Sequence, residues 1–301
     1  MLMQAIDTYL ALRRAAGFRL RSTERYLRYF ARFASARGET HVQSQTAVDW
    51  AGHARTEAER HRRLRTVTHF ARFMQIEDPR YELPPEGVFR GNHQRPTPYL
   101  FTDDELQRLL AHTQRLRPAG SLRPHTYSTL FTLLAVTGLR PSEALALRLP
   151  DITPEGLVIR DTKFGQSRFV PVHATTLEAL DRYRQCRCRI AGHIDHLFVS
   201  LKRRPLSLGS ATRTFRQVLK AAGLPDRPGR PRLYDLRHRF ATRALETGPA
   251  SRELISQHML ALATYLGHSH ITYTYWYLEQ TPKLMADIAM SCEAFVFGGP
   301  S

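Results

Sequence analysis

The chain has 301 residues, long enough for two domains, and a hydrophobic content of 42% that can supply each with a core. Its net charge of +17 favours a protein that binds nucleic acid over a basic protein without such a partner, since basic residues exceed acidic ones both before and after residue 95. No apolar run approaches the ~18 residues of a membrane span, no signal peptide begins the chain, and the three cysteines form no disulfide framework. We therefore expect a cytoplasmic, nucleoid-associated protein.

Four stretches with apolar residues at helical spacing predict a small all-α domain over residues 1–78. Ser22 or Thr23 is expected to cap the second helix, and Gly38 to stop it. The expected helices cover residues 2–16, the stretch between Thr23 and Gly38, residues 45–54 and residues 57–75.

One face of the fourth helix carries a row of arginines, and two interpretations of it remain open. Arginines on one side of a packed helix can follow a DNA backbone, but they can equally form a solvated face. The residues of this row are Arg60, Arg62, Arg63, Arg65 and Arg72, and the first four are our candidate DNA-binding residues.

Residues 79–98 are predicted to form an interdomain linker, because prolines and glycines are too dense there for a long regular element. The residues concerned are Pro79, Pro84, Pro85, Gly87, Gly91, Pro96 and Pro98. The second domain is then expected to cover residues 99–301.

The second domain is predicted to be helical around one small β region. Thr102 and the acidic residues after it form an N-terminal helix signature, and an apolar helix over 124–137 stops at Gly138. β-branched runs predict strands at 157–159, 169–172 and 197–199, of which the first two form a hairpin. Further helices are expected from Thr102 through Leu110, after Pro141, and over 174–190, 207–222, 235–246, 250–265, 272–279 and 282–292.

Five short segments carry the residue types that attack on a phosphodiester requires. A planar guanidinium donates bidentately to phosphate, a lysine can shift its pKa and supply a proton, and a phenol can act as a nucleophile. In chain order the segments are 137–143 with Arg140, 162–168 with Lys163, 234–242 with Arg237, 265–268 with His268, and finally Tyr277. Lysine is rare in this chain, which has only Lys163, Lys202, Lys220 and Lys283.

In order and spacing, these segments resemble the tyrosine recombinase (phage integrase) family. The resemblance covers about residues 100–285 and implies a mostly α fold with a small β-sheet (α+β). The helical front end is similar, on weaker grounds, to the family's core-binding (SAM-like) domain. The sequence around Trp276 and Pro282 also resembles recombinases of transposons or integrated elements.

The resemblance implies a role for each residue at a matching position. Arg140 and Arg237 clamp the phosphate oxygens, Lys163 protonates the leaving oxygen, His268 hydrogen-bonds the phosphate, and Tyr277 forms a 3′-phosphotyrosine. Glu143 orients the arginines, and Arg168 is expected to contact DNA. This chemistry requires no cofactor, metal or ATP.

Residue 234 departs from the family pattern, because Tyr234 stands where a histidine is usual. A phenol can donate to a phosphate oxygen, but it is a poor base near neutral pH. Assistance by a base to Tyr277 is therefore open, and we interpret His238 as structural.

Several alternatives remain open at this level. Tyr273 and Tyr275 compete with Tyr277 as nucleophile, and only the nine-residue offset from His268 favours Tyr277. A metal site at His258, His268 and His270 is disfavoured, because their spacing matches no tight ligand pattern. Two rival functions are a type IB topoisomerase-like enzyme and a non-catalytic DNA-binding protein on a recombinase scaffold.

Family resemblance also predicts the assembly. It implies double-stranded DNA as the partner and four protomers on two DNA sites, without a membrane. The last predicted helix, 282–292, then docks on a neighbouring protomer or packs on its own domain.

Overall fold

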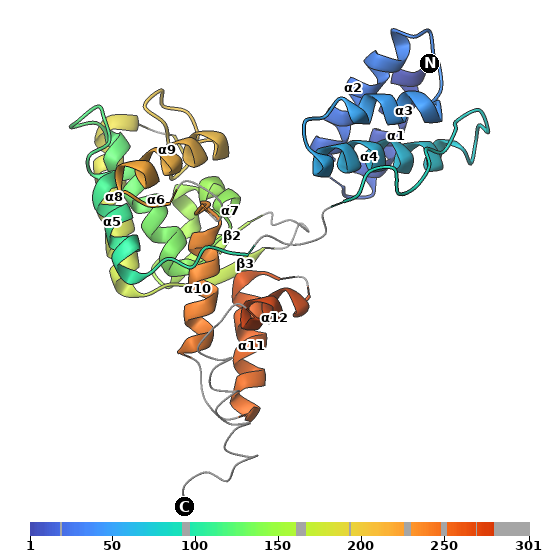
Figure 1. The fold of residues 1–301 in the computed structure, drawn as a ribbon. Coiled ribbons are helices and arrows are strands. Elements are labelled where there is room, and N and C mark those ends of the chain that lie inside the picture. Colours follow the sequence, from blue (N-terminus) through green and yellow to red (C-terminus); the bar gives the residue numbers. More distant parts are fainter. Residues whose placement is uncertain are drawn as a thin grey trace, which may run out of the picture. The chain divides into compact units, whose positions relative to one another are not determined.

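The computed structural model describes residues 1–18, 20–91, 97–160, 167–192, 194–225, 230–247, 252–268 and 270–279 (Figure 1). The chain forms two compact units, residues 1–95 and 96–301. The described part is mostly helical with one small β-sheet, as the sequence predicts. None of the described helices is both long and apolar enough to cross a membrane.

The first unit consists of four helices around one apolar core. Its largest buried side chains include Phe30 and Phe70, whose helices pack on each other. One expectation is wrong: the second helix has no side-chain cap, because it begins directly after Leu20, whose backbone is left-handed (φ 44°). The helices are α1 Leu2–Ala15, α2 Arg21–Ser35, α3 Ser44–Gly52 and α4 Glu57–Met74.

The first unit extends further along the chain than the sequence suggests. Tyr81 is buried in its core, and the backbone N–H of Glu82 donates to Val42 O over 2.9 Å. His61 Nδ1 lies 2.9 Å from Phe89 O. The part of the predicted linker that the structure describes up to residue 91 therefore packs on the first unit, although residues 79–91 form no helix or strand.

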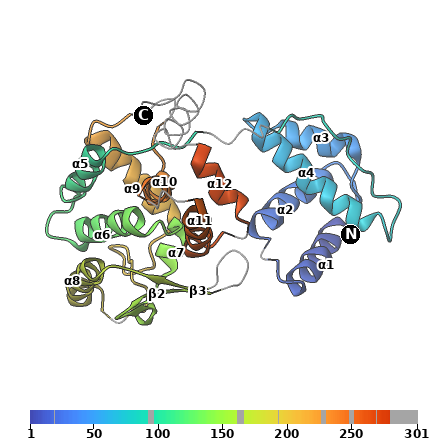
Figure 2. The same cartoon turned by 90° about the horizontal axis from the view of Figure 1, so that it is seen from below.

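The second unit is built around α6 Leu122–Thr137, most of whose side chains are buried. Figure 2 shows α6 running between α5 and α9 on one side and α8 on the other. The predicted N-terminal helix signature is present at the start of α5 as a capping box, in which Thr102 and Glu105 bond each other's backbone N–H. The helices around α6 are α5 Asp103–Thr113, α7 Pro141–Ala146, α8 Ala174–Ala191 and α9 Leu208–Ala221.

The sheet is antiparallel in the order β1-β2-β3, with β1 Ile152–Thr153, β2 Gly156–Ile159 and β3 Arg168–Pro171. The predicted hairpin of β2 and β3 is present, with Leu157 opposite Val170. The prediction of a third strand at 197–199 is wrong. That buried stretch forms backbone hydrogen bonds with residues outside any strand instead. Leu197 N–H donates to Leu147 O, and Phe198 O accepts from Leu206 N–H.

The last described helices are α10 Asp235–Glu246, α11 Arg252–Leu266 and α12 Thr272–Glu279. They share a small apolar cluster, distinct from the main core of the second unit, which includes Leu245, Met259, Leu262, Leu266 and Tyr277. The predicted helix 282–292 lies outside the described residues.

Gly138 ends α6 in the left-handed region (φ 60°), and a Cβ there would lie 2.3 Å from Phe240 Cδ1. We expect Gly138→Ala to lower the free energy of unfolding by about 2–4 kcal/mol, from backbone strain plus the clash. Gly223 is a matched control: its φ is 67°, but a Cβ there would meet no heavy atom within 4 Å. Gly223→Ala should cost only about 1 kcal/mol.

Urea-induced unfolding of the two glycine variants measures this difference. Equal losses would show that Phe240 moves aside without cost and that Gly138 is needed only for its backbone conformation.

Candidate active site

The turn between α6 and α7 presents Arg140. Gly138 ends the first helix and Pro141 starts the next, so Arg140 occupies the N-cap position of α7. Its side chain is only 19% exposed. Its Nη1 donates to Glu143 Oε1 over 2.6 Å, and its Nη2 donates to Gly267 O over 2.7 Å.

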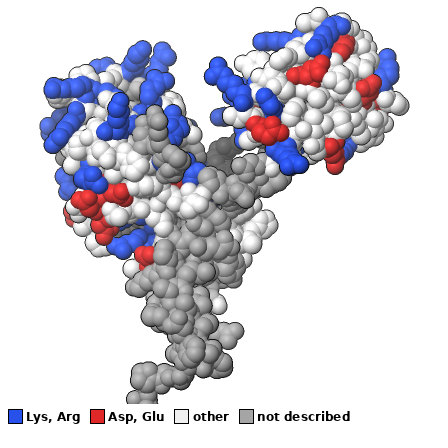
Figure 3. Space-filling model, in the orientation of Figure 1, with Lys and Arg blue, Asp and Glu red and all other residues white. Residues whose placement is uncertain are grey.

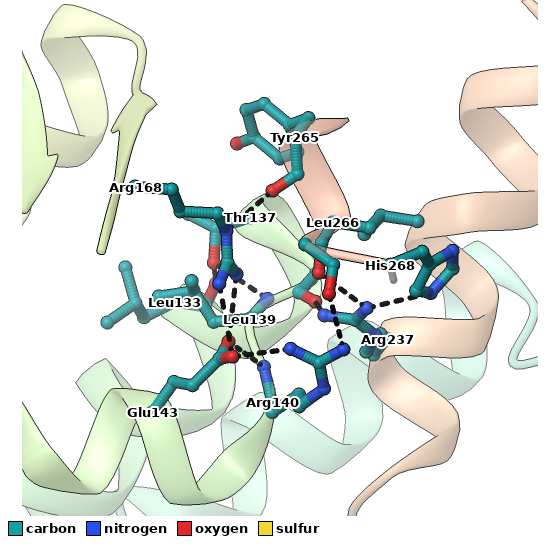
Figure 4. A network of polar contacts seen from close by, with 12 residues as sticks. Leu133, Thr137, Leu139, Arg140, Glu143, Arg168, Arg237, Tyr265, Leu266 and His268 are labelled. Atoms are coloured by element: carbon teal, nitrogen blue, oxygen red, sulfur yellow. Dashed lines mark hydrogen bonds and ion pairs between the residues drawn. The ribbon is translucent and has the colours of Figure 1, made fainter. Parts of the chain in front are cut away.

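Glu143 is the shared acceptor of two arginines (Figure 4). Besides the hydrogen bond from Arg140, its carboxylate accepts hydrogen bonds from Nη1 and Nη2 of Arg168 over 3.1 and 2.8 Å. Burial alone would raise the pKa of this carboxyl, but Arg168 and then Arg140 lower it to about 2. Glu143 is therefore charged throughout the physiological range and orients the two guanidiniums.

Arg237, on α10, is 1% exposed and lies between two helix ends. Its Nη1 donates to Gly138 O over 2.7 Å, and its Nη2 donates to Leu266 O over 2.8 Å. Burial lowers its pKa below the ordinary value. Arg140, Arg168 and Arg237 thus share this cluster of described residues with one carboxylate, Glu143, which pairs with the first two, and the cluster holds an excess of two positive charges.

Three successive carbonyl oxygens at the end of α11 each accept from a different arginine. Tyr265 O receives Arg168 Nε over 2.9 Å, Leu266 O receives Arg237, and Gly267 O receives Arg140 (Figure 4). Carbonyls at a helix C-terminus have no partner within the helix and carry partial negative charge, which suits them to cations. This turn holds the arginines without neutralising them.

His268 follows this turn and contacts both Arg237 and α12. Its Nε2 lies 3.0 Å from Arg237 Nη2, and its Nδ1 lies 2.7 Å from Thr274 Oγ1. A guanidinium can only donate, so Nε2 is the acceptor and the proton resides on Nδ1. Burial, followed by the charges of Arg237 and Arg140, lowers the pKa of His268 to about 3. In this structure the ring orients Arg237.

We expect NMR to find His268 as the neutral Nδ1–H tautomer, without titration between about pH 5 and 8. The unfolded chain binds a proton there below its usual pKa of 6.5, whereas the folded chain does so only near 3. Folding stability from this group therefore falls as the pH drops from 6.5 towards 3. His268→Asn assigns the signal, and a midpoint near 6.5 would contradict the arrangement.

The described tyrosines of α12 differ in their surroundings. Tyr277 is 3% exposed, and its ring stacks on His268 with centroids 6.1 Å apart at 12°. Burial raises the pKa of its phenol, an effect that the Arg237 guanidinium partly opposes. Tyr273 is 40% exposed and lies beside His268 and His270. The side chain of Tyr275 lies outside the described residues.

Tyr234 lies at the N-cap of α10 and is 39% exposed. Burial alone would lower the pKa of Arg140, but Glu143 and, to a smaller degree, the Tyr234 phenol raise it. The ring of His238 lies between two tyrosines, 5.2 Å from Tyr234 and 5.5 Å from Tyr277 by centroids. Its Nε2 is 3.8 Å from the buried Asp235.

The expectations for Lys163, for Arg168 and for a histidine metal site have different outcomes. Lys163 lies outside the described residues. Arg168 was expected to contact DNA, but its guanidinium is directed inwards at Glu143 and is only 12% exposed. Of the three histidines considered and disfavoured as a metal site, His258 contacts Ala244 O over 2.8 Å. The described ranges contain no group of three His, Cys, Asp or Glu residues arranged to hold a metal.

The arginine row of α4 has intramolecular partners. Arg62 pairs with Glu59 over 3.0 Å, and Arg60 donates to Ala54 O over 2.9 Å. Arg63 is half-buried and lies over the ring of Trp50, whereas Arg65 is exposed and contacts His69. Figure 3 shows Lys and Arg side chains gathered over the upper part of the second unit, and basic and acidic side chains intermixed on the first.

Two residues of the cluster lie in segments that the sequence singled out, but neither was given a role of its own. Thr274 is fully buried and holds His268. Gly267 has a φ of 66°, and its lack of a side chain makes room for Arg168. The signals were a threonine among tyrosines and a glycine within the segment 265–268, and neither residue type indicates its particular contact.

Comparison with known proteins identifies the class. A model of the phage integrase family matches residues 100–283, more than half of the chain. The chain therefore belongs to the phage integrase family and is a tyrosine-type site-specific recombinase. Its relative y4rB of Sinorhizobium fredii, which carries an integrase/recombinase name, is 38% identical over 297 residues, 94% of each protein. Tyrosine recombinase XerD of Halalkalibacterium halodurans is 28% identical and covers 89% of this chain and 87% of that protein.

Solved structures share the fold. The Tn1549 transposon integrase in complex with transposon right end DNA has a TM-score of 0.66 at 18% identity, covering 97% of this chain and 99% of that one. A lambda integrase tetramer bound to a Holliday junction has a TM-score of 0.64 at 19% identity, covering 92% and 76%.

Proposed function

We propose that this recombinase cuts and rejoins double-stranded DNA through a 3′-phosphotyrosine formed by Tyr277. The observation that carries the proposal is the excess of buried guanidinium charge beside the Tyr277 phenol. A phosphodiester brings a negative charge, and its pentacovalent transition state concentrates more on the non-bridging oxygens. Donors fixed in advance in a partly dry site stabilise such charge far better than water does.

In the proposed reaction, the Tyr277 phenol releases its proton to solvent and its oxygen bonds to phosphorus while the bond to the 5′-oxygen breaks. Arg140 and Arg237 donate to the non-bridging oxygens, and Lys163 gives the leaving 5′-oxygen its proton, as the family resemblance implies. Tyr234 is close enough to Arg140 to act as a further donor to the phosphate. The phosphotyrosine keeps the energy of the broken bond, so attack by a 5′-hydroxyl reseals the strand without ATP or metal.

The assembly on DNA is part of this proposal. We propose that both units bind duplex DNA and that four protomers exchange strands between two sites. The fold shared with DNA-bound integrases, among them a tetramer on a Holliday junction, supports this. The likeness to a transposon integrase supports an origin in a mobile element.

Covalent trapping on DNA flanking the protein's own gene tests the function. The DNA is labelled and nicked so that the cleaved end diffuses away, and the products are separated on a denaturing gel. We expect a labelled protein–DNA adduct from the wild-type chain.

The same purified protein, assayed on further DNA substrates, distinguishes the two rival functions. A topoisomerase-like enzyme would relax supercoiled plasmid and yield no joint products between two sites. A non-catalytic DNA-binding protein would bind the flanking DNA and form no adduct, and Tyr234 would then be the first residue to examine.

A further inference from the structure

Arg168 is the first residue of β3, and all three of its guanidinium nitrogens have acceptors within the protein. Nη1 and Nη2 donate to the two carboxylate oxygens of Glu143 over 3.1 and 2.8 Å, and Nε donates to Tyr265 O over 2.9 Å. The two-point arrangement on a carboxylate is the strongest that a guanidinium makes. With 12% of its side chain exposed, Arg168 is built into the protein.

Arg168 also packs against the turn that precedes His268. A Cβ on Gly267 would lie 2.7 Å from Arg168 Nη1 and 2.9 Å from its Cζ. Glycine suits residue 267 for two reasons: its φ of 66° and the closeness of this guanidinium. The turn that Arg168 supports supplies Leu266 O to Arg237 and Gly267 O to Arg140.

Arg168 thus contacts both groups that orient the arginines proposed to clamp the phosphate. It fixes Glu143, which holds Arg140, and it fixes the backbone that holds both Arg140 and Arg237. Without Arg168, the buried carboxylate oxygens of Glu143 would lose two donors, and the carboxylate could turn fully towards Arg140. Arg140 would then lose donors that it needs for a phosphate.

We propose that Arg168 is a positioning residue that acts on DNA cleavage through Glu143 and the 265–267 turn. The proposal rests on the function proposed above, because it concerns the geometry of the same clamp. A displacement of about 1 Å in such a clamp can reduce a rate by about 100-fold.

The test compares Arg168→Met and Arg168→Lys with wild type in single-turnover adduct formation on the trapped duplex. We expect the rate to fall by about 100-fold for Arg168→Met, with DNA affinity nearly unchanged. Arg168→Lys keeps the charge but cannot bond both Glu143 oxygens and Tyr265 O together, so we expect partial rescue. It also serves as the test variant if Arg168→Met does not fold.

Arg160→Met is the matched control. Arg160 directly follows β2, its side chain is 62% exposed, and it pairs with Asp151 over 2.6 Å. The substitution therefore also removes one positive charge next to β3, but from the surface. We expect its cleavage rate to stay within roughly threefold of wild type.

The salt dependence of DNA binding separates positioning from direct contact. Loss of a phosphate contact lowers the slope of log affinity against log salt by about one, and loss of a positioning residue leaves it unchanged. A second readout is a double-mutant cycle with Glu143→Gln. If Arg168 acts through Glu143, the two effects on the cleavage rate are not additive.

The outcomes are distinguishable. Two results together would overturn the proposal in favour of a DNA contact. The slope of log DNA affinity against log salt would be lower by about one for Arg168→Met than for wild type, and its effect on the cleavage rate would add to that of Glu143→Gln. Normal cleavage by Arg168→Met would overturn it as well. If the wild-type chain forms no adduct on DNA that it binds, the proposed function itself fails.

Discussion

Tyr277→Phe should abolish the covalent adduct, whereas Tyr273→Phe should form it normally. Tyr277 is the described tyrosine of α12 that is buried beside Arg237 and His268, and Tyr273 is 40% exposed. The substitution removes one oxygen and keeps the ring that packs with Leu266 and its neighbours, so the variant should remain folded. Without that oxygen no phosphorus–oxygen bond can form, and we expect no detectable adduct.

The controls for this experiment are the other tyrosines of the helix. Tyr275→Phe joins Tyr273→Phe, and DNA binding is measured for every variant so that loss of chemistry is separated from loss of affinity. Loss of the adduct with Tyr273→Phe or Tyr275→Phe alone would move the nucleophile to that residue. Loss with none of the three would place it outside α12.

Arg237→Lys should reduce adduct formation by about 100- to 1,000-fold, the range seen when a fixed donor to a developing oxyanion is removed. Arg237 bonds Gly138 O, Leu266 O and His268 from one planar group. An ammonium keeps the charge, but it is a single point that cannot span these acceptors and a phosphate together. DNA affinity should change much less than the rate.

Arg243→Lys, on the same helix, is the control. Its side chain is 54% exposed and pairs with Asp103 over 3.1 Å, so we expect cleavage within roughly twofold of wild type. If Arg237→Lys does not fold, Arg140→Lys replaces it, since Arg140 is partly exposed. Wild-type cleavage by folded Arg237→Lys would remove Arg237 from the proposed clamp.

Much of the fold could be predicted from local signals. Apolar spacing located the helices, Thr102 and the acidic residues after it marked the start of α5, and Gly138 marked the end of α6. Strand β1 could not be predicted, because two residues carry no periodicity. The stretch 197–199 is apolar because it is buried among loops, and a sequence pattern does not distinguish that from a strand.

The limits at the site have a different physical origin. The residue types for phosphate chemistry, and their order along the chain, were visible in the sequence. The direction of Arg168 was not, because it depends on the tertiary packing of β3 against α11. Likewise, nothing local distinguishes a surface arginine on α4 from Arg63, which packs on Trp50 from another helix.

The arginine cluster has a consequence for the heat resistance of the protein. Main-chain carbonyls accept the guanidinium hydrogens but cancel none of their charge, so most of the repulsion within the cluster persists in the free protein. A phosphate anion that enters relieves it, and any ligand that binds only the folded form raises stability by mass action. If the cluster binds phosphate as proposed, we expect the recombinase to resist heat best with DNA bound, and its melting temperature to report on occupancy of the site.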